Sequence, residues 1–261
     1  MYRPFGVVGA LLATTIAGTV LLELNLQRKI ILLKIQVFLL FFMVMCALSR
    51  FVWINLTVLL PNRLSYSKSS LVVHWVLYVV LSIFLGLASF SHLIGRLFVG
   101  SEPYFISRLA FTCLGLILLM FFNLCVLTVV FAALRVCRFT LPNADKLKAI
   151  VAITVSLLLC MKGLTAASRG PTIVGLTVPL AKLPRSLDGT RIVQLSDIHM
   201  GPMIGHAALD RVVNMVSVIK PDIIVITGDL VDSTVANLKQ AILPLKNMRS
   251  KYGSFFVTGT K

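Results

Sequence analysis

The sequence predicts an α-helical membrane bundle of about five spans, followed by a small α/β domain with the element order β-α-β-α-β. Three observations support this prediction. Of the 261 residues, 58% are apolar and only 13% are charged, whereas about a quarter of the residues in a soluble domain are charged. Several apolar runs before residue 168 reach the roughly 20 residues that cross a bilayer. After residue 168, short β-branched runs alternate with helical patterns, which favours a parallel sheet.

Five apolar runs are the expected spans of a multi-pass membrane domain over residues 1–168. The first run follows Arg3 and therefore also resembles a signal sequence, but no clear small-residue cleavage site follows it. The second run contains Lys34 and Arg50, whose long side chains can reach the membrane surface. The spans are expected at about residues 5–22, 30–60, 71–90, 109–134 and 147–167.

A net charge of +16 usually indicates a nucleic-acid partner, but the positions of the basic residues favour a lipid bilayer instead. The basic residues are scattered singly in the short loops between apolar runs, where they contact lipid headgroups and set the topology. Lys and Arg are almost equally frequent in the loops on the two sides, so their distribution leaves the orientation open. The five cysteines lie in or beside the apolar runs without CxxC spacing, so we expect buried thiols and not disulfides or zinc ligands.

The second expected domain covers residues 169–261 and follows a linker-like Ser-Arg-Gly-Pro sequence. The helices are expected where apolar residues recur every three or four positions, and the second of them is interrupted by Pro244. The strands expected at 191–196 and 223–227 are short, mainly apolar and β-branched runs, which are typical of strands that are buried on both faces. We expect helices at about 209–219 and 235–248, and strands at 172–178, 191–196, 223–227 and 254–258.

Acidic and imidazole side chains follow two of these strands, at the point where each strand ends. Asp197 and His199 come directly after strand 191–196, and Asp229 follows strand 223–227. The carboxyl ends of parallel strands meet at one edge of a sheet, which is where ligands bind in open α/β folds. Carboxylates and imidazole are suitable ligands for a divalent metal ion. The alternative interpretation is that the two aspartates are turn or helix-cap residues.

The motifs Asp197–Ile198–His199 and Gly228–Asp229 resemble the first two motifs of the calcineurin-like metallophosphoesterase family, D-x-H and G-D. The resemblance covers about residues 172–259, and the flanking sequence is similar to the membrane-anchored branch of the family. It implies that Asp197 and His199 bind the first of two divalent ions of the Mn, Fe or Zn class and that Asp229 bridges both. It also implies a phosphate-ester substrate, which metal-bound water would attack at phosphorus.

The later family motifs, G-N-H and G-H-x-H, are not complete in this sequence. Gly259 fits the first of them, but Thr260 and Lys261 stand where the family has Asn and His. We therefore expect residues 169–261 to be the N-terminal part of the domain, in a C-terminally truncated form with weak or partial metal binding and no complete catalytic site. The alternatives are a non-enzymatic anchor, scaffold or regulator that pairs with a full-length form, and an unstable product with an exposed apolar strand at 254–258.

Overall fold

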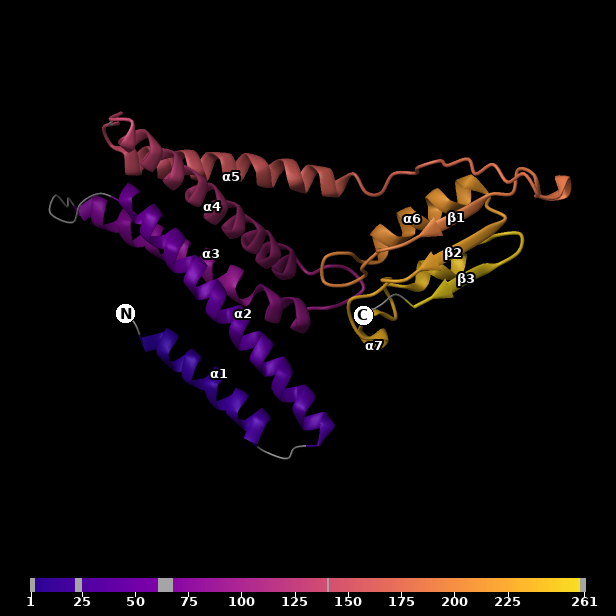
Figure 1. Cartoon of the computed structure of the whole chain (residues 1–261), viewed down its shortest axis with the longest axis horizontal. Coiled ribbons are helices and arrows are strands. Elements are labelled where there is room, and N and C mark those ends of the chain that lie inside the picture. The colour runs from indigo at the N-terminus through magenta and orange to yellow at the C-terminus, as the bar shows by residue number, and fades with distance from the viewer. Residues whose placement is uncertain (1–2, 22–24, 61–67, 140, 259–261) are drawn as a thin grey trace. The chain divides into compact units, whose positions relative to one another are not determined.

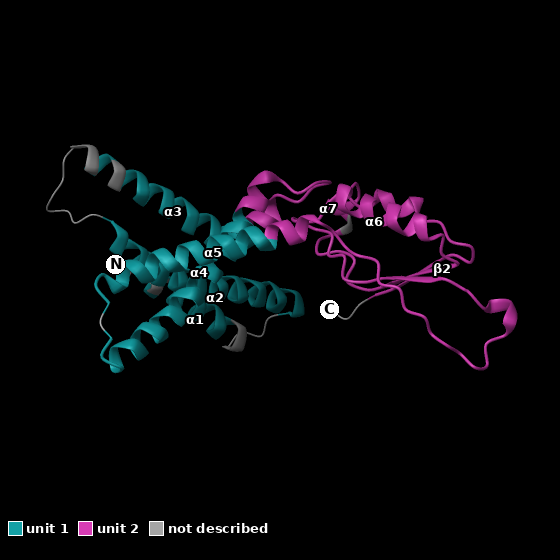
Figure 2. Ribbon diagram, turned by 90° about the horizontal axis from the view of Figure 1, so that it is seen from above, with its two compact units in different colours: residues 1–92, 110–163 teal, residues 93–109, 164–261 magenta. Residues whose placement is uncertain are grey.

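The computed structural model describes residues 3–21, 25–60, 68–139 and 141–258 of the chain (Figure 1). These residues form two compact units, which are coloured separately in Figure 2. The first unit consists of residues 1–92 and 110–163, and the second of residues 93–109 and 164–261. The second unit thus combines the C-terminal part of the chain with the end of one long helix, the start of the next and the loop between them.

The N-terminal part of the chain consists of long apolar helices. Four helical segments of the described part are long and apolar enough to cross a membrane: Leu26–Leu59, Trp75–Leu97, Phe105–Val136 and Ala144–Ser168. The fifth expected span is a helix, α1, but only Val8–Gly18 within it is found as a shorter apolar helix, so its crossing stays a prediction. The helix bounds are Arg3–Leu21 for α1, Leu26–Leu56 for α2, Lys68–Leu97 for α3, Phe105–Val136 for α4 and Ala144–Ser168 for α5.

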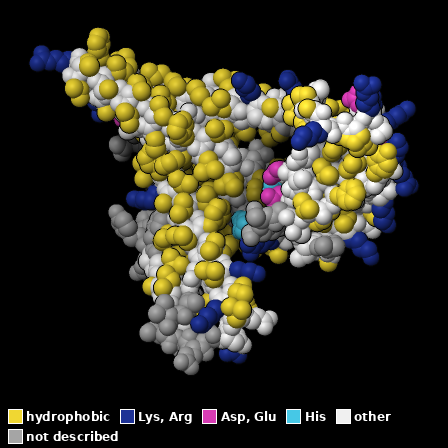
Figure 3. All heavy atoms as spheres, turned by 45° about the vertical axis from the view of Figure 1, so that its right-hand side comes forward, with side chains coloured by type: hydrophobic (Ala, Val, Ile, Leu, Met, Phe, Trp, Pro, Cys, Tyr) yellow, Lys and Arg dark blue, Asp and Glu magenta, His cyan; other side chains and the backbone are white. Residues whose placement is uncertain are grey.

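The surfaces of these helices suit a lipid environment. Figure 3 shows hydrophobic side chains spread over them, and large apolar residues such as Val129, which is 70% exposed, face outward. Ala110 of α4 and Ala149 and Ala152 of α5 are fully buried. Such small residues are typical of positions where membrane helices pack closely. The chain is an integral, multi-pass membrane protein.

The C-terminal part contains a parallel three-stranded sheet with the strand order β1-β2-β3. Its strands are β1 (Ile192–Leu195), β2 (Ile223–Thr227) and β3 (Ser254–Val257). The helix α6 (His206–Ile219) connects β1 to β2. These elements confirm the predicted partial α/β domain, because the apolar runs formed strands and the run with helical spacing formed a helix.

The α6 helix covers one face of the sheet (Figure 1). Val216 of α6 is packed with Ile224 and Ile226 of β2 in a buried cluster. The expectation that the strands are buried on both faces was wrong for the described residues: β2 alternates between buried and half-buried positions, and all four residues of β3 are exposed. A continuous apolar run shows that a strand can be buried, but the covering elements decide which faces are.

Two other expectations for this part were wrong. Residues 172–178 form no strand and are exposed, because no strand of the described part lies beside them to accept their hydrogen bonds. The expected helix 235–248 is shortened to α7 (Val235–Leu238), followed by the 3-10 helix η4 (Leu243–Asn247). Pro244, which has no amide hydrogen to donate, lies at the start of η4 and limits the α-helix. Residues 259–261, where the third family motif was expected, lie outside the described residues.

Candidate metal centre

The loops that follow β1 and β2 are joined to each other by backbone hydrogen bonds. The amide of His199 donates to the carbonyl of Asp229 (3.0 Å), and the amide of Met200 donates to the carbonyl of Leu230 (2.9 Å). Met200 then accepts a hydrogen bond from the amide of Asp232 (2.9 Å) and forms an isolated parallel bridge with Val231. The pairing of β1 with β2 thus resumes beyond the strand ends and fixes the two loops against each other.

This pairing brings Asp197, His199 and Asp229 together. One ligand atom of each side chain lies within 4.8 Å of the others, with Asp197 and His199 exposed and Asp229 half-buried. The His199 Nε2 atom lies 3.9 Å from the Asp197 Oδ1 atom. The parallel strands had predicted that these side chains would meet at one edge of the sheet, and the structure brings them together there.

All three residues have left-handed backbone conformations. Their φ angles are +56° at Asp197, +51° at His199 and +45° at Asp229, and Gly228 has a φ angle of +97°. Non-glycine residues rarely adopt this region, although Asp, Asn and His do so more readily than others. The left-handed turns end the strands abruptly and hold the side chains at the sheet edge, a type of backbone strain that gathers at functional sites.

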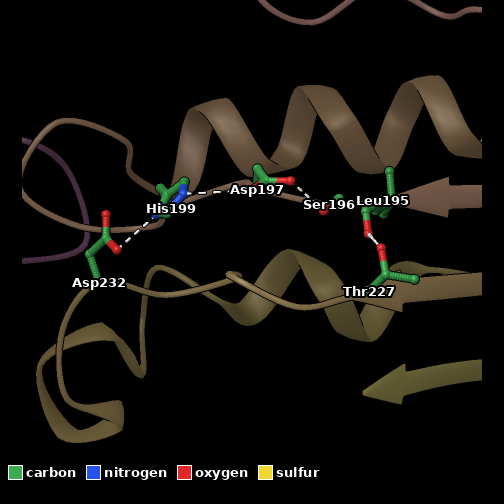
Figure 4. A network of polar contacts seen from close by, with 6 residues as sticks. All are labelled: Leu195, Ser196, Asp197, His199, Thr227 and Asp232. Carbon is green, nitrogen blue, oxygen red and sulfur yellow. Dashed lines mark hydrogen bonds and ion pairs between the residues drawn. The ribbon is translucent and has the colours of Figure 1, made fainter. Parts of the chain in front are cut away.

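Asp232 is a site residue that the sequence analysis missed. Its Oδ1 atom lies 2.8 Å from the His199 Nδ1 atom, as Figure 4 shows. Because a carboxylate accepts, Nδ1 is the donor in this contact, and Nε2, on the side of Asp197, is the nitrogen that could bind a metal ion. Histidines that bind metal ions usually have such a carboxylate on their other nitrogen. The hydrogen bond to Asp232 is the largest cause of the raised pKa of His199, followed by the charge of Asp232, and the charges of Asp229 and Asp197 add to it.

Further side-chain hydrogen bonds position the end of β1, just before Asp197. Thr227 accepts a hydrogen bond from the Gln194 side chain (2.9 Å). The Thr227 hydroxyl also lies 3.5 Å from the carbonyl of Leu195 (Figure 4). The Ser196 hydroxyl donates to the Asp197 carboxylate. These contacts hold the first turn of the loop without using the ligand atoms that face His199.

The donor set fits a divalent ion. Two ligands that each lie about 2.1 Å from one ion are at most about 4.2 Å apart, so the present cluster would close on an ion with side-chain shifts of a few tenths of an ångström. The two oxygens of one carboxylate can also bridge two ions about 3.5–4 Å apart. The negative charges of Asp197, Asp229 and Asp232 outnumber the single imidazole of His199, so this edge of the sheet attracts cations.

The family of this domain is identified by comparison with known proteins. Residues 190–259 match the model of the calcineurin-like phosphoesterase family. A bacterial relative, an uncharacterized metallophosphoesterase of Campylobacter jejuni, is 33% identical over 107 residues, which cover 41% of this chain and 28% of the relative. No solved structure matches the chain.

Two vertebrate relatives extend the match into the membrane part. The transmembrane protein with metallophosphoesterase domain of Danio rerio is 36% identical over 187 residues, and that of Bos taurus is 38% identical over 190 residues. Each alignment covers 69% of this chain, but only 43% of the relative. The chain therefore carries a calcineurin-like metallophosphoesterase domain in its C-terminal part, and it is similar to these transmembrane relatives over a longer stretch than that domain.

Proposed function

We propose that this chain carries the membrane anchor and the first half of the metal centre of a metal-dependent phosphoesterase. Asp197 and His199 would bind one divalent ion, and Asp229 would bridge it to a second. The observation that carries the proposal is the convergence of these three side chains within 4.8 Å at the end of a parallel sheet. Bound metal would supply a nucleophilic water and neutralise the phosphate oxygens of an ester.

The residues of the chain would act by positioning. Asp232 orients the His199 imidazole through Nδ1, so that Nε2 points toward the same space as the carboxylate of Asp197. The backbone bonds between the loops keep Asp229 beside this pair. A site that is formed before the ion arrives loses little entropy on binding, which is an advantage for a catalytic metal.

The three candidate ligands among the described residues are fewer than two ions require, so we also propose that the chain by itself hydrolyses phosphate esters negligibly. A complete site would need further imidazoles, as in the G-N-H and G-H-x-H motifs. Of the other three histidines in the sequence, His74 and His92 belong to α3 and His206 is the first residue of α6. The chain should therefore bind metal more weakly than a protein with all the motifs.

Metal stoichiometry tests the proposed site. The purified chain is dialysed against Mn²⁺, and bound metal is measured by elemental analysis together with Asp229→Asn and the control Asp188→Asn, which changes an exposed aspartate that follows the short 3-10 helix Arg185–Leu187. We expect substoichiometric metal in the wild type and the control and less in Asp229→Asn. Equal metal in all three would refute the assignment of Asp229.

A second candidate function is the regulation of a longer form of the same protein by pairing with it. The outer edge of β3 favours this role, because Phe255, Phe256 and Val257 are more than half exposed (56%, 55% and 58%) and one side of the strand has no partner among the described residues. Such an edge can pair with another strand. Co-expression with a full-length relative tests it, since an unchanged activity, amount and location of that relative would refute the regulatory role.

A further inference from the structure

The α6 helix begins without a capping side chain of its own. Its N-cap residue is Gly205, which forms no side-chain hydrogen bond. The first amides of an α-helix have no acceptor within the helix, and one of them commonly donates a hydrogen bond to the side chain of a Ser, Thr, Asp or Asn at the N-cap. The acceptors for two amides of α6 must therefore come from elsewhere.

These acceptors belong to the loop between α3 and α4, about a hundred residues earlier in the chain. The amide of His206 donates to the carbonyl of Ser101 (2.8 Å), and the amide of Ala207 donates to Glu102 Oε1 (2.6 Å). Glu102 is one of only three acidic residues among the first 162. Its negative charge is also favourable at the positive end of the helix dipole.

The contact is close enough to explain why residue 205 is a glycine. A Cβ atom on Gly205 would lie 2.6 Å from Pro103 Cδ, 2.7 Å from Glu102 Oε2 and 2.7 Å from the carbonyl oxygen of Ser101. Gly205 is buried, and its φ angle of −116° makes no demand for glycine. Glycine is thus needed at position 205 because the 98–104 loop approaches closely, and not because of the backbone conformation.

The 98–104 loop is braced by contacts of its own and reaches the domain core. Ser107, in the first turn of α4, donates to the carbonyl of Phe98 (3.1 Å), and the rings of Phe98 and Tyr104 pack edge to face at 5.9 Å. Val99 packs against the buried cluster of Met200, Leu209, Val213, Leu238 and Ala241. The loop therefore contributes both hydrogen-bond acceptors and an apolar side chain to the second unit (Figure 2).

We propose that the 98–104 loop is an integral part of the metallophosphoesterase domain. Its contacts with α6 and the buried cluster, which we call the latch, attach the domain to the ends of α3 and α4. The domain boundary then includes residues 93–109 as well as residues 164–261, and an excised fragment 169–261 lacks the acceptors for α6. The latch also requires that the loop and the domain lie on the same side of the membrane. The topology allows this, because α4 and α5 together cross the membrane twice between the loop and the domain.

Cysteine labelling in sealed vesicles tests the sidedness. In a background without the five native cysteines, single cysteines replace Ser101 in the loop, Val218 in α6 and Phe139 between α4 and α5, all of which are exposed. With a membrane-impermeant maleimide we expect Ser101→Cys and Val218→Cys to be modified from the same side and Phe139→Cys from the other. Modification of Ser101→Cys and Val218→Cys from opposite sides would overturn the proposal.

Hydrogen exchange on the full chain tests the contact itself. We expect the amides of residues 206–209 to exchange about tenfold faster in Glu102→Ala and in Gly205→Ala, the scale of a lost helix cap. Glu102→Gln keeps an oxygen acceptor and should be intermediate. The control Gly175→Ala has open space around its Cβ atom and should match the wild type. The amides of β2 report whether a variant has unfolded, and unchanged exchange at residues 206–209 in a folded Glu102→Ala would refute the latch.

Discussion

Replacing Asp232 tests whether the residue positions His199 for metal. Carboxylates that hold a ligating imidazole typically contribute 10- to 100-fold to metal affinity. The contact is short, at 2.8 Å between Oδ1 and Nδ1, but both side chains are 46% exposed, so water can replace part of the lost bond. We therefore expect Asp232→Ala to weaken Mn²⁺ binding about tenfold, the lower end of that range, which corresponds to about 1.4 kcal/mol.

The assay is a competition between the purified chain and a fluorescent chelator for Mn²⁺. Asp232→Asn keeps an oxygen that can accept the His199 Nδ1 hydrogen, so it should lose less affinity than Asp232→Ala. Asp188→Ala is the control for the loss of one negative charge. If Asp229→Asn weakens binding while Asp232→Ala and Asp188→Ala bind like the wild type, Asp232 does not position the imidazole.

Three further predictions concern stability. Leu209 is fully buried, so Leu209→Ala should lower the free energy of unfolding of the C-terminal unit by about 2–5 kcal/mol. Val218 is 79% exposed, so Val218→Ala should lower it by less than about 0.5 kcal/mol. Pulse proteolysis measures both. Equal losses would show that α6 does not form the core. Gly228 has a φ angle of +97°, so Gly228→Ala should lower the free energy of unfolding of the C-terminal unit by about 1 kcal/mol or more. Gly175→Ala, which has open space around its Cβ atom, should leave that free energy unchanged. The Asn123 side chain of α4 donates a hydrogen bond to the Ser156 hydroxyl of α5 (2.9 Å), so Asn123→Ala should weaken the contact of α4 with α5 by about 0.6 kcal/mol in a detergent unfolding assay. An unchanged stability would show that this bond does not stabilise the contact.

The sequence predicted those features that depend on neighbouring residues. The runs at Ile192–Leu195 and Ile223–Thr227 are rich in β-branched residues, and they form strands. Leu209, Val213 and Val216 recur every three or four positions, and they lie on the buried side of α6. Asp197, His199 and Asp229 were predictable as a group because the strand ends of a parallel sheet share one edge.

The features that the sequence did not predict depend on distant partners. The alternation in residues 172–178 indicates a strand only if another strand lies beside it, and none of the described strands does. Asp232 follows Asp229 by three residues, so a carboxylate close to the second motif was visible, but its contact with His199 depends on how the two loops pair. Glu102 was visible only as a rare acid between apolar runs, and its partner lies 105 residues away.

The separation between Glu102 and α6 has a consequence for the order of events during synthesis. Ribosomes add about 5–20 residues per second, so the 105 residues between Glu102 and Ala207 take roughly 5–20 s to make. The α3–α4 loop is thus present well before the helix that it caps. During that interval α4 and α5 are delivered to the membrane, and the nascent domain meets a loop that is already anchored there, which would guide the first turn of α6 as soon as it emerges.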